Sequence, residues 1–172
     1  MKFRPFVLPI AALVVAVSAS PASAQTYPAK SVRLVLPFAP GSAVDVLGRH
    51  YAQKMSEQWK QQVVVDNRTG ANGMIAYELG AKGNPDGYTI LHATPSFALN
   101  TIVFKKLAYD LHRDFTPITN IAQGFGYLML VHPSVQATNV RELIAYAKAQ
   151  SKPLTYGTPG VGNTLHLATE LF

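Results

Sequence analysis

The sequence of 172 residues contains no cysteine. It therefore has no disulfide, no thiolate nucleophile and no cysteine-ligated metal. A protein without cysteine is compatible with an oxidising compartment. It also lacks a membrane-length apolar run, because residues 6–17 fall well short of the ~20 residues that span a bilayer. GxSxG, GxGxxG and HExxH signatures are missing too. We therefore expect no metal and no cofactor.

The N-terminus has the pattern of an export signal. Lys2 and Arg4 precede the apolar run, which small residues follow up to Ala22-Ser23-Ala24. This order predicts a signal peptide over residues 1–24, cleaved after Ala24. Removing these 24 of the 172 residues leaves 148, one ordinary domain by length, and lowers the formal charge from +6 to +4.

Basic residues outside the signal are scattered rather than clustered, and only Lys105 and Lys106 are adjacent. A nucleic-acid-binding surface usually gathers its positive charges on one face. We therefore expect these residues to be solvated, with no nucleic-acid partner.

Short apolar runs alternate with segments of helical periodicity. Expected strands cover residues 31–38, 62–67, 88–93, 126–132 and 154–158. The first expected helix has an apolar face from Val44 to Trp59. The other expected helices cover residues 74–82, 140–149 and 163–172, and one more begins at Thr94. This order predicts an α/β fold with a parallel sheet covered by helices. The last helix reaches residue 172 without a cap signal, so we expect a chain that is cut short.

Three loops follow expected strands and precede expected helices: Phe38 to Asp45, Thr94 to Phe97, and Thr158 to Thr164. In an open α/β sheet such loops bind ligands, and a helix N-terminus suits phosphate or carboxylate. A purely structural alternative stays open for the first loop. In that alternative Ser42 caps the helix and Asp45, three residues later, is its reciprocal partner.

The third loop, "GTPGVGNT", matches the phosphate-binding pattern GxxxxGK[ST] except that Asn163 replaces the lysine. That lysine would contact the β and γ phosphates. We therefore expect a cradle for a simpler anion rather than nucleotide hydrolysis. His166 could approach this loop from its helix, although a lone histidine is more often packed or exposed.

An ordered set of motifs carries a resemblance to a known family. The set includes "LPFAPGSAVD", "VVVDNRTGANG", "NPDGYTIL", "DFTPIT" and "YGTPGVGNTLHLATELF". The chain resembles the tripartite tricarboxylate transporter substrate-binding proteins, also called the Bug family of periplasmic solute receptors. The resemblance implies a two-lobed, type II periplasmic-binding-protein fold. It also implies a monomer in the periplasm that binds a small carboxylate solute and delivers it to the membrane subunits of the transporter.

The resemblance also implies the site and the domain boundaries. The implied ligand-binding residues are Phe38, Ala39, Gly41, Ser42, Asp45, Thr94, Ser96, Thr158, Gly160, Asn163, Thr164 and His166. Lobe one would span residues 25–122, a crossover 123–126, and the beginning of an incomplete lobe two 127–172, because family members are about twice as long. Asp45 would cap the helix or select polar ligands through water.

Two departures from the family pattern affect this site. Gly41-Ser42 stands where the family usually has paired glycines, and Pro159 removes one amide donor from the third loop. Two rival interpretations stay open: an exported hydrolase using Asp45 and His166, and a truncated product without binding activity.

Overall fold

The structure is a computed structural model that describes residues 26–124 and 126–172. The predicted signal peptide and its cleavage site lie outside these residues, and the predicted crossover 123–126 lies only partly within them.

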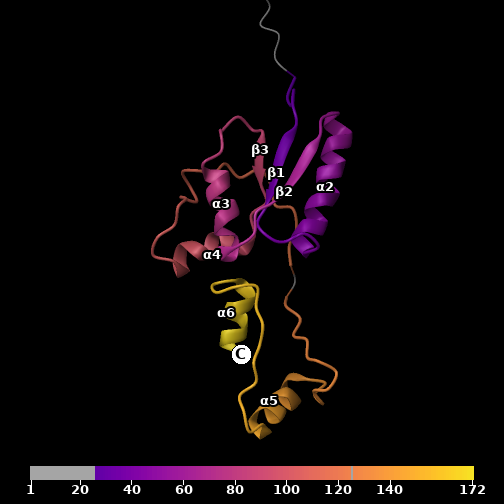
Figure 1. Cartoon of the computed structure of the whole chain (residues 1–172), viewed down its shortest axis with the longest axis vertical. Coiled ribbons are helices and arrows are strands. Elements are labelled where there is room, and N and C mark those ends of the chain that lie inside the picture. Colours follow the sequence, from indigo (N-terminus) through magenta and orange to yellow (C-terminus); the bar gives the residue numbers. More distant parts are fainter. Residues whose placement is uncertain (1–25, 125) are drawn as a thin grey trace, which may run out of the picture.

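A three-stranded parallel sheet organises the first half of the chain (Figure 1). Its strands are β1 (Val32–Leu36), β2 (Val63–Asn67) and β3 (Thr89–Leu91), in the order β2-β1-β3. Leu34, in the central strand, is opposite Val65 of β2 and Ile90 of β3. The three strands predicted for this half are therefore confirmed, each shorter than its apolar run.

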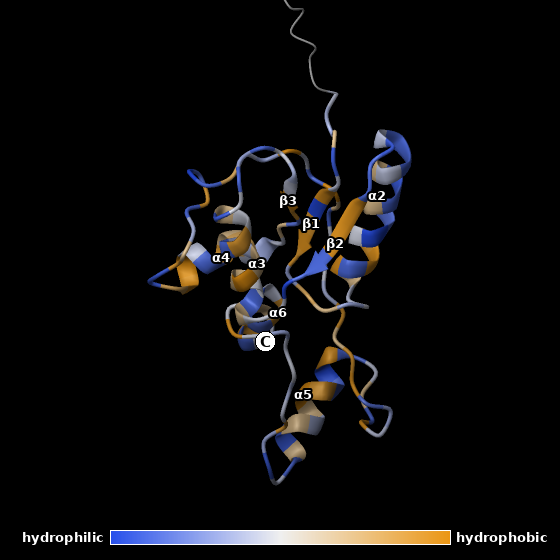
Figure 2. Ribbon diagram, turned by 45° about the horizontal axis from the view of Figure 1, so that its top comes forward, coloured by the Kyte–Doolittle hydropathy of each residue, from blue (hydrophilic) through white to orange (hydrophobic). Residues whose placement is uncertain are grey.

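Helices connect these strands and continue beyond them. They are α2 (Ala43–Trp59), the short 3-10 helix η2 (Ala71–Gly73), α3 (Met74–Ala81), α4 (Pro95–Val103), α5 (Val140–Ala149) and α6 (Thr164–Leu171). Figure 2 shows that β1 and β2 are largely hydrophobic apart from a hydrophilic end of β2, and that the helices carry both hydrophilic and hydrophobic residues. No helix in the described part of the chain is long and apolar enough to cross a membrane.

The two faces of β1 pack into two hydrophobic clusters. One face buries Val32, Leu34 and Leu36 against Ala52 of α2. The other buries Val35 with Ala76 and Tyr77 of α3 and with Tyr109. Because side chains of a strand alternate between faces, a strand buried on both faces needs apolar residues at nearly every position. This explains why a nearly continuous apolar run predicted β1.

The prediction of two further strands, at 126–132 and 154–158, is wrong. Both segments are without strand structure, and Leu128 and Leu130 are 89% and 86% exposed. A strand forms only when its backbone N–H and C=O groups pair with a neighbour, and the described residues supply no neighbouring strand to either segment. Apolar composition therefore predicted a strand where the pairing it requires is missing.

Candidate functional site

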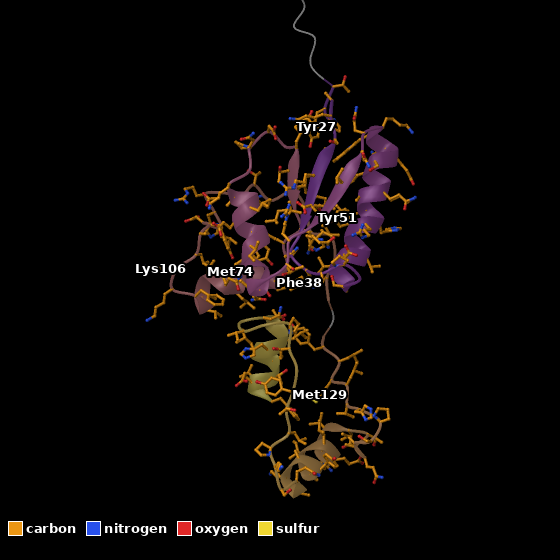
Figure 3. All side chains as sticks on the ribbon, in the orientation of Figure 1. Tyr27, Phe38, Tyr51, Met74, Lys106 and Met129 are labelled. Carbon is orange, nitrogen blue, oxygen red and sulfur yellow. The ribbon has the colours of Figure 1, made fainter. Side chains whose placement is uncertain are left out.

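The parallel sheet gathers the predicted loops at one edge. Where β1 and β3 end, the chain turns directly into α2 and α4, so both helices begin at the carboxyl edge. Figure 3 shows Phe38 and Met74 at this edge and Tyr27 at the opposite end of the sheet. α6 comes from the second half of the chain, and its N-terminus points toward α3 and α4 (Figure 1).

The first loop is held by its own side chains. Ser42 is the N-cap of α2, and its Oγ accepts a hydrogen bond from the Asp45 amide at 3.3 Å. Asp45 in turn accepts from the Gly41 amide at 2.9 Å. The capping alternative for Ser42 is therefore confirmed, with Gly41 in place of Ser42 as the reciprocal donor. The Gly41 amide is thus already engaged.

Asp45 is a buried carboxylate that the protein itself satisfies. It is 3% exposed and accepts hydrogen bonds from Arg49 Nε at 3.0 Å and Asn67 Nδ2 at 2.9 Å. The Arg49 guanidinium, followed by the Gly41 amide and the Asn67 amide, lowers the pKa of Asp45 from 3.8 to about 2. A carboxylate this acidic is a poor general base at neutral pH, which weakens the hydrolase alternative.

Sequence reasoning missed Arg49 and Asn67 as parts of this loop. Asn67 Nδ2 also donates to the Phe38 carbonyl at 2.9 Å, and Arg49 Nη2 donates to Asn67 Oδ1 at 3.1 Å. The sequence signal that could have found Asn67 was its place as a polar residue at the end of the apolar run of β2. These contacts fix the path of the loop between β1 and α2.

Replacing Gly41 with alanine is expected to destabilise the protein by about 1 to 2 kcal/mol, because Gly41 has a φ of +83°. No atom lies within 4 Å of an added Cβ, so the cost is backbone strain alone. Urea unfolding measures it. Gly157→Ala is the matched control, since Gly157 has equal space and no positive φ. Equal stability of the two variants would contradict the prediction.

Acidification is expected to remove the stability that ionised Asp45 contributes. Its pKa is lower in the folded chain, so this contribution is complete above pH 3.8 and is lost as the pH falls through about 2. Asp45→Asn should therefore be less stable than the parent near neutral pH. The difference between their free energies of unfolding should narrow as the pH falls from 3.8 to about 2. Urea unfolding across the pH range tests this, and a difference that persists at the acidic end would contradict it.

The second and third loops are in direct contact. Ser96, in the first turn of α4, is buried, and its Oγ accepts from Asn163 Nδ2 at 3.2 Å. Asn163 is the N-cap of α6, where its Oδ1 accepts from the Leu165 amide at 2.9 Å. Thr94 caps α4 without a side-chain capping bond, and its Oγ1 pairs with Tyr77 Oη at 2.9 Å. The structure thus opposes the N-termini of α4 and α6.

The other predicted site residues are less constrained. Phe38 is half-buried and Ala39 exposed, while Thr158, Gly160 and Thr164 are half-buried around the third loop. Among the described residues, no hydrogen bond joins the first loop to the other two. His166 approaches Glu170 at 3.8 Å, and its Nδ1 is buried without a partner. Asp45 and His166 are not paired, so the geometry assembles no catalytic dyad from them.

Two buried asparagines at this edge were also missed. Asn72 Nδ2 donates to Asn100 Oδ1 at 2.9 Å, and Asn72 Oδ1 accepts from Asn163 Nδ2 at 3.1 Å. Asn72 has a φ of +54°, a left-handed conformation that asparagine tolerates better than most residues. The "GANG" sequence was therefore the one available signal. Within the described chain, no group of three or more acidic or histidine side chains could hold a metal ion.

Two open hollows of about 430 and 470 Å³ lie on either side of Arg33 in the sheet. They are lined by neighbours of Arg33 such as Asp66 and Glu78, and by no residue of the three loops. Paired charges line the first, since Arg33 and Arg68 both bind Asp66. We therefore locate the site from the opposed helix N-termini rather than from these hollows.

An open parallel α/β sheet, with loops at its carboxyl edge facing a helix from a second segment, is one arrangement found in periplasmic-binding-protein-like folds. The sequence model of the tripartite tricarboxylate transporter family receptor matches residues 47–172. The chain therefore belongs to this family, as the motifs predicted. Protein BugT of Bordetella pertussis is 33% identical over 156 residues, covering 90% of this chain and 48% of BugT.

Solved structures agree on the fold. R. palustris Rpa4515 with adipate has a TM-score of 0.73 and 37% identity, over 84% of this chain and 48% of that one. MatC (Rpa3494) from Rhodopseudomonas palustris with bound malate has a TM-score of 0.60 and 25% identity, over 72% of this chain and 42% of that one. The chain spans about half the length of the curated relatives it matches.

Proposed function

We propose that this chain is part of a periplasmic solute receptor that binds a small carboxylate and delivers it to the membrane subunits of a tripartite tricarboxylate transporter. One observation carries the proposal. α2 and α4 begin at one edge of the sheet, and α6 begins opposite α4, with Asn163 and Ser96 in contact at 3.2 Å. Helix N-termini attract anions through their free N–H groups and partial positive charge.

The chemistry of this edge favours a carboxylate over a nucleotide. Its predicted ligand groups are backbone amides, the hydroxyls of Ser42, Thr94, Thr158 and Thr164, and the imidazole of His166. The one acid among the predicted site residues, Asp45, is already neutralised by Arg49, so it would not repel an incoming anion. The third loop lacks the lysine of phosphate-binding loops.

The neighbours support the same class of solute. Rpa4515 was solved with adipate and MatC with malate, both dicarboxylates. By analogy we propose a receptor without catalytic activity that is monomeric, located in the periplasm and cleaved after Ala24. In this proposal residues 25–122 form the first lobe, 123–126 the crossover and 127–172 the beginning of the second lobe.

Titration calorimetry of the exported protein with adipate and with malate tests the proposal. Adipamide is the matched control ligand, because it keeps the length of adipate and replaces both carboxylates with neutral amides. We expect saturable binding of at least one acid, no binding of adipamide and no turnover. Equal binding of adipate and adipamide, chemical conversion of a bound acid, or the failure of both acids to bind would overturn the proposal.

N-terminal sequencing of the protein recovered from the periplasm tests the export proposal. We expect the mature chain to begin at Gln25. Recovery of an uncleaved chain in the membrane fraction would contradict it.

A further inference from the structure

We propose that Asn163 is a latch that docks the loop before α6 onto the first lobe in the absence of any solute. Its receptacle consists of Asn72, Ser96 and Asn100, and we call these three residues the asparagine receptacle. Asn163 is then a positioning residue. It sets the fraction of molecules in which the second segment, residues 126–172, covers the carboxyl edge of the sheet. The consequence for solute affinity rests on the proposed function, whereas the docking itself does not.

The two ends of the Asn163 side chain have separate tasks. Oδ1 accepts from the Leu165 amide at 2.9 Å and caps α6. Nδ2 crosses to the first lobe, where it donates to Asn72 Oδ1 at 3.1 Å and to Ser96 Oγ at 3.2 Å. The carbonyl oxygen therefore caps α6, and the amide nitrogen attaches α6 to the first lobe.

The receptacle is organised without help from Asn163. Asn72 Nδ2 donates to Asn100 Oδ1 at 2.9 Å, so the Asn72 amide is oriented by a residue of its own lobe. Asn72 and Asn100 are 7% and 0% exposed, and Ser96 is 2% exposed. A buried acceptor left without a donor is costly. With α6 docked, Asn72 Oδ1 and Ser96 Oγ both accept a hydrogen bond from Asn163 Nδ2, so neither acceptor is left unpaired in the buried contact.

Burial in the second segment is concentrated at the latch. Within residues 126–172, all of which the structure describes, only Gly162 and Asn163 are buried. α5 lies at the far end of the molecule from the sheet (Figure 1), while α6 contacts α4. The attachment of this segment to the first lobe is therefore local.

Gly162 gives the latch its close fit. It has a φ of +78°, and an added Cβ would lie 3.1 Å from Val103 Cγ1 and 3.2 Å from Phe104 Cε2, at the end of α4. A side chain here would both strain the backbone and push the loop away from α4. Gly162 is thus a second, steric requirement for the docking that Asn163 secures by hydrogen bonds.

The latch has a consequence for solute binding. A ligand that needs both segments binds only the docked fraction, so its apparent dissociation constant is the intrinsic one divided by that fraction. Loosening the latch would lower the docked fraction and so weaken binding, in addition to any loss of Asn163 as a predicted ligand-binding residue. With two buried hydrogen bonds removed, we expect a loss of affinity of about tenfold.

The absence of cysteine allows a direct test on the ligand-free protein. Lys106→Cys and Leu171→Cys place spin labels on two exposed sites, one after α4 and one at the end of α6. Pulsed electron resonance then gives the distribution of distances between the labels. We expect one narrow distribution in the parent. Asn163→Ser, which keeps a capping oxygen but loses both crossing bonds, should give a broad distribution extending to longer distances.

Controls separate the latch from helix capping and from solute binding. Asn139 caps α5 through the Glu142 amide at 3.0 Å, and among the described residues its side chain makes no hydrogen bond to the first lobe, so Asn139→Ser should leave the distances unchanged. Ser96→Ala, which removes one acceptor from the receptacle, should give an intermediate broadening. An unchanged distribution in Asn163→Ser, or equal broadening in Asn139→Ser, would overturn the latch. Because no solute is present, that failure is distinct from a failure to bind adipate or malate.

Discussion

Replacing Leu34 with alanine is expected to lower the free energy of unfolding by about 2 to 5 kcal/mol. Leu34 is fully buried in the central strand and packs in the cluster that joins the sheet to α2. Truncation removes its apolar contacts and leaves a cavity between three strands and a helix, which can collapse only in part. Such a loss is large against a total stability of about 5 to 15 kcal/mol.

Urea unfolding followed by fluorescence measures this effect well. The single tryptophan, Trp59, packs against the same cluster and reports on its unfolding. Val64→Ala is the control, because Val64 lies in the neighbouring strand and is 44% exposed, so we expect a cost below about 1 kcal/mol. If Leu34→Ala cost no more than this control, the assignment of β1 to the core would be wrong.

Replacing Tyr77 with alanine is expected to cost about 3 to 5 kcal/mol. Tyr77 is fully buried on the other face of the sheet, with its ring centroid 4.9 Å from that of Phe97 and 5.7 Å from that of Tyr109. Its hydroxyl also pairs with Thr94 Oγ1 at 2.9 Å. This one side chain thus joins the second cluster to the start of α4.

Tyr77→Phe separates the ring from the hydroxyl. It keeps the packing and removes the bond to Thr94, so we expect a cost of about 0.5 to 1.5 kcal/mol in urea unfolding. Tyr127→Phe is the matched control, since Tyr127 is exposed, and it should leave stability unchanged. Equal costs for Tyr77→Phe and Tyr77→Ala would show that the stability comes from the hydrogen bond and not from ring packing.

The first half of the fold could be predicted because its signals are local. Each apolar run of β1, β2 and β3 is followed by a loop and a helix whose periodicity marks its buried face. The runs at 126–132 and 154–158 also contain apolar residues, yet they form no strand. Composition reports how much apolar surface a segment carries, whereas a strand also needs a partner, which composition does not supply.

Contacts at the carboxyl edge were predictable where the residues are close in sequence. Ser42 and Asp45 are three residues apart, and their spacing alone predicted the capping interaction that the structure contains. Asn72 and Asn163 are 91 residues apart, and an asparagine in a loop has the same appearance whether it is solvated or buried. No local pattern separates the two cases, so the asparagine receptacle emerged only from the tertiary structure.

The charge state of Asp45 bears on the proton balance of the proposed solute capture. With its pKa held at about 2 by Arg49, Gly41 and Asn67, this carboxylate is ionised throughout the neutral range. An acid that docks beside it would meet a charge already compensated within the protein and would displace no proton from it. Asp45 would then contribute no proton to capture at this edge, and any proton exchanged on binding would have to come from other groups.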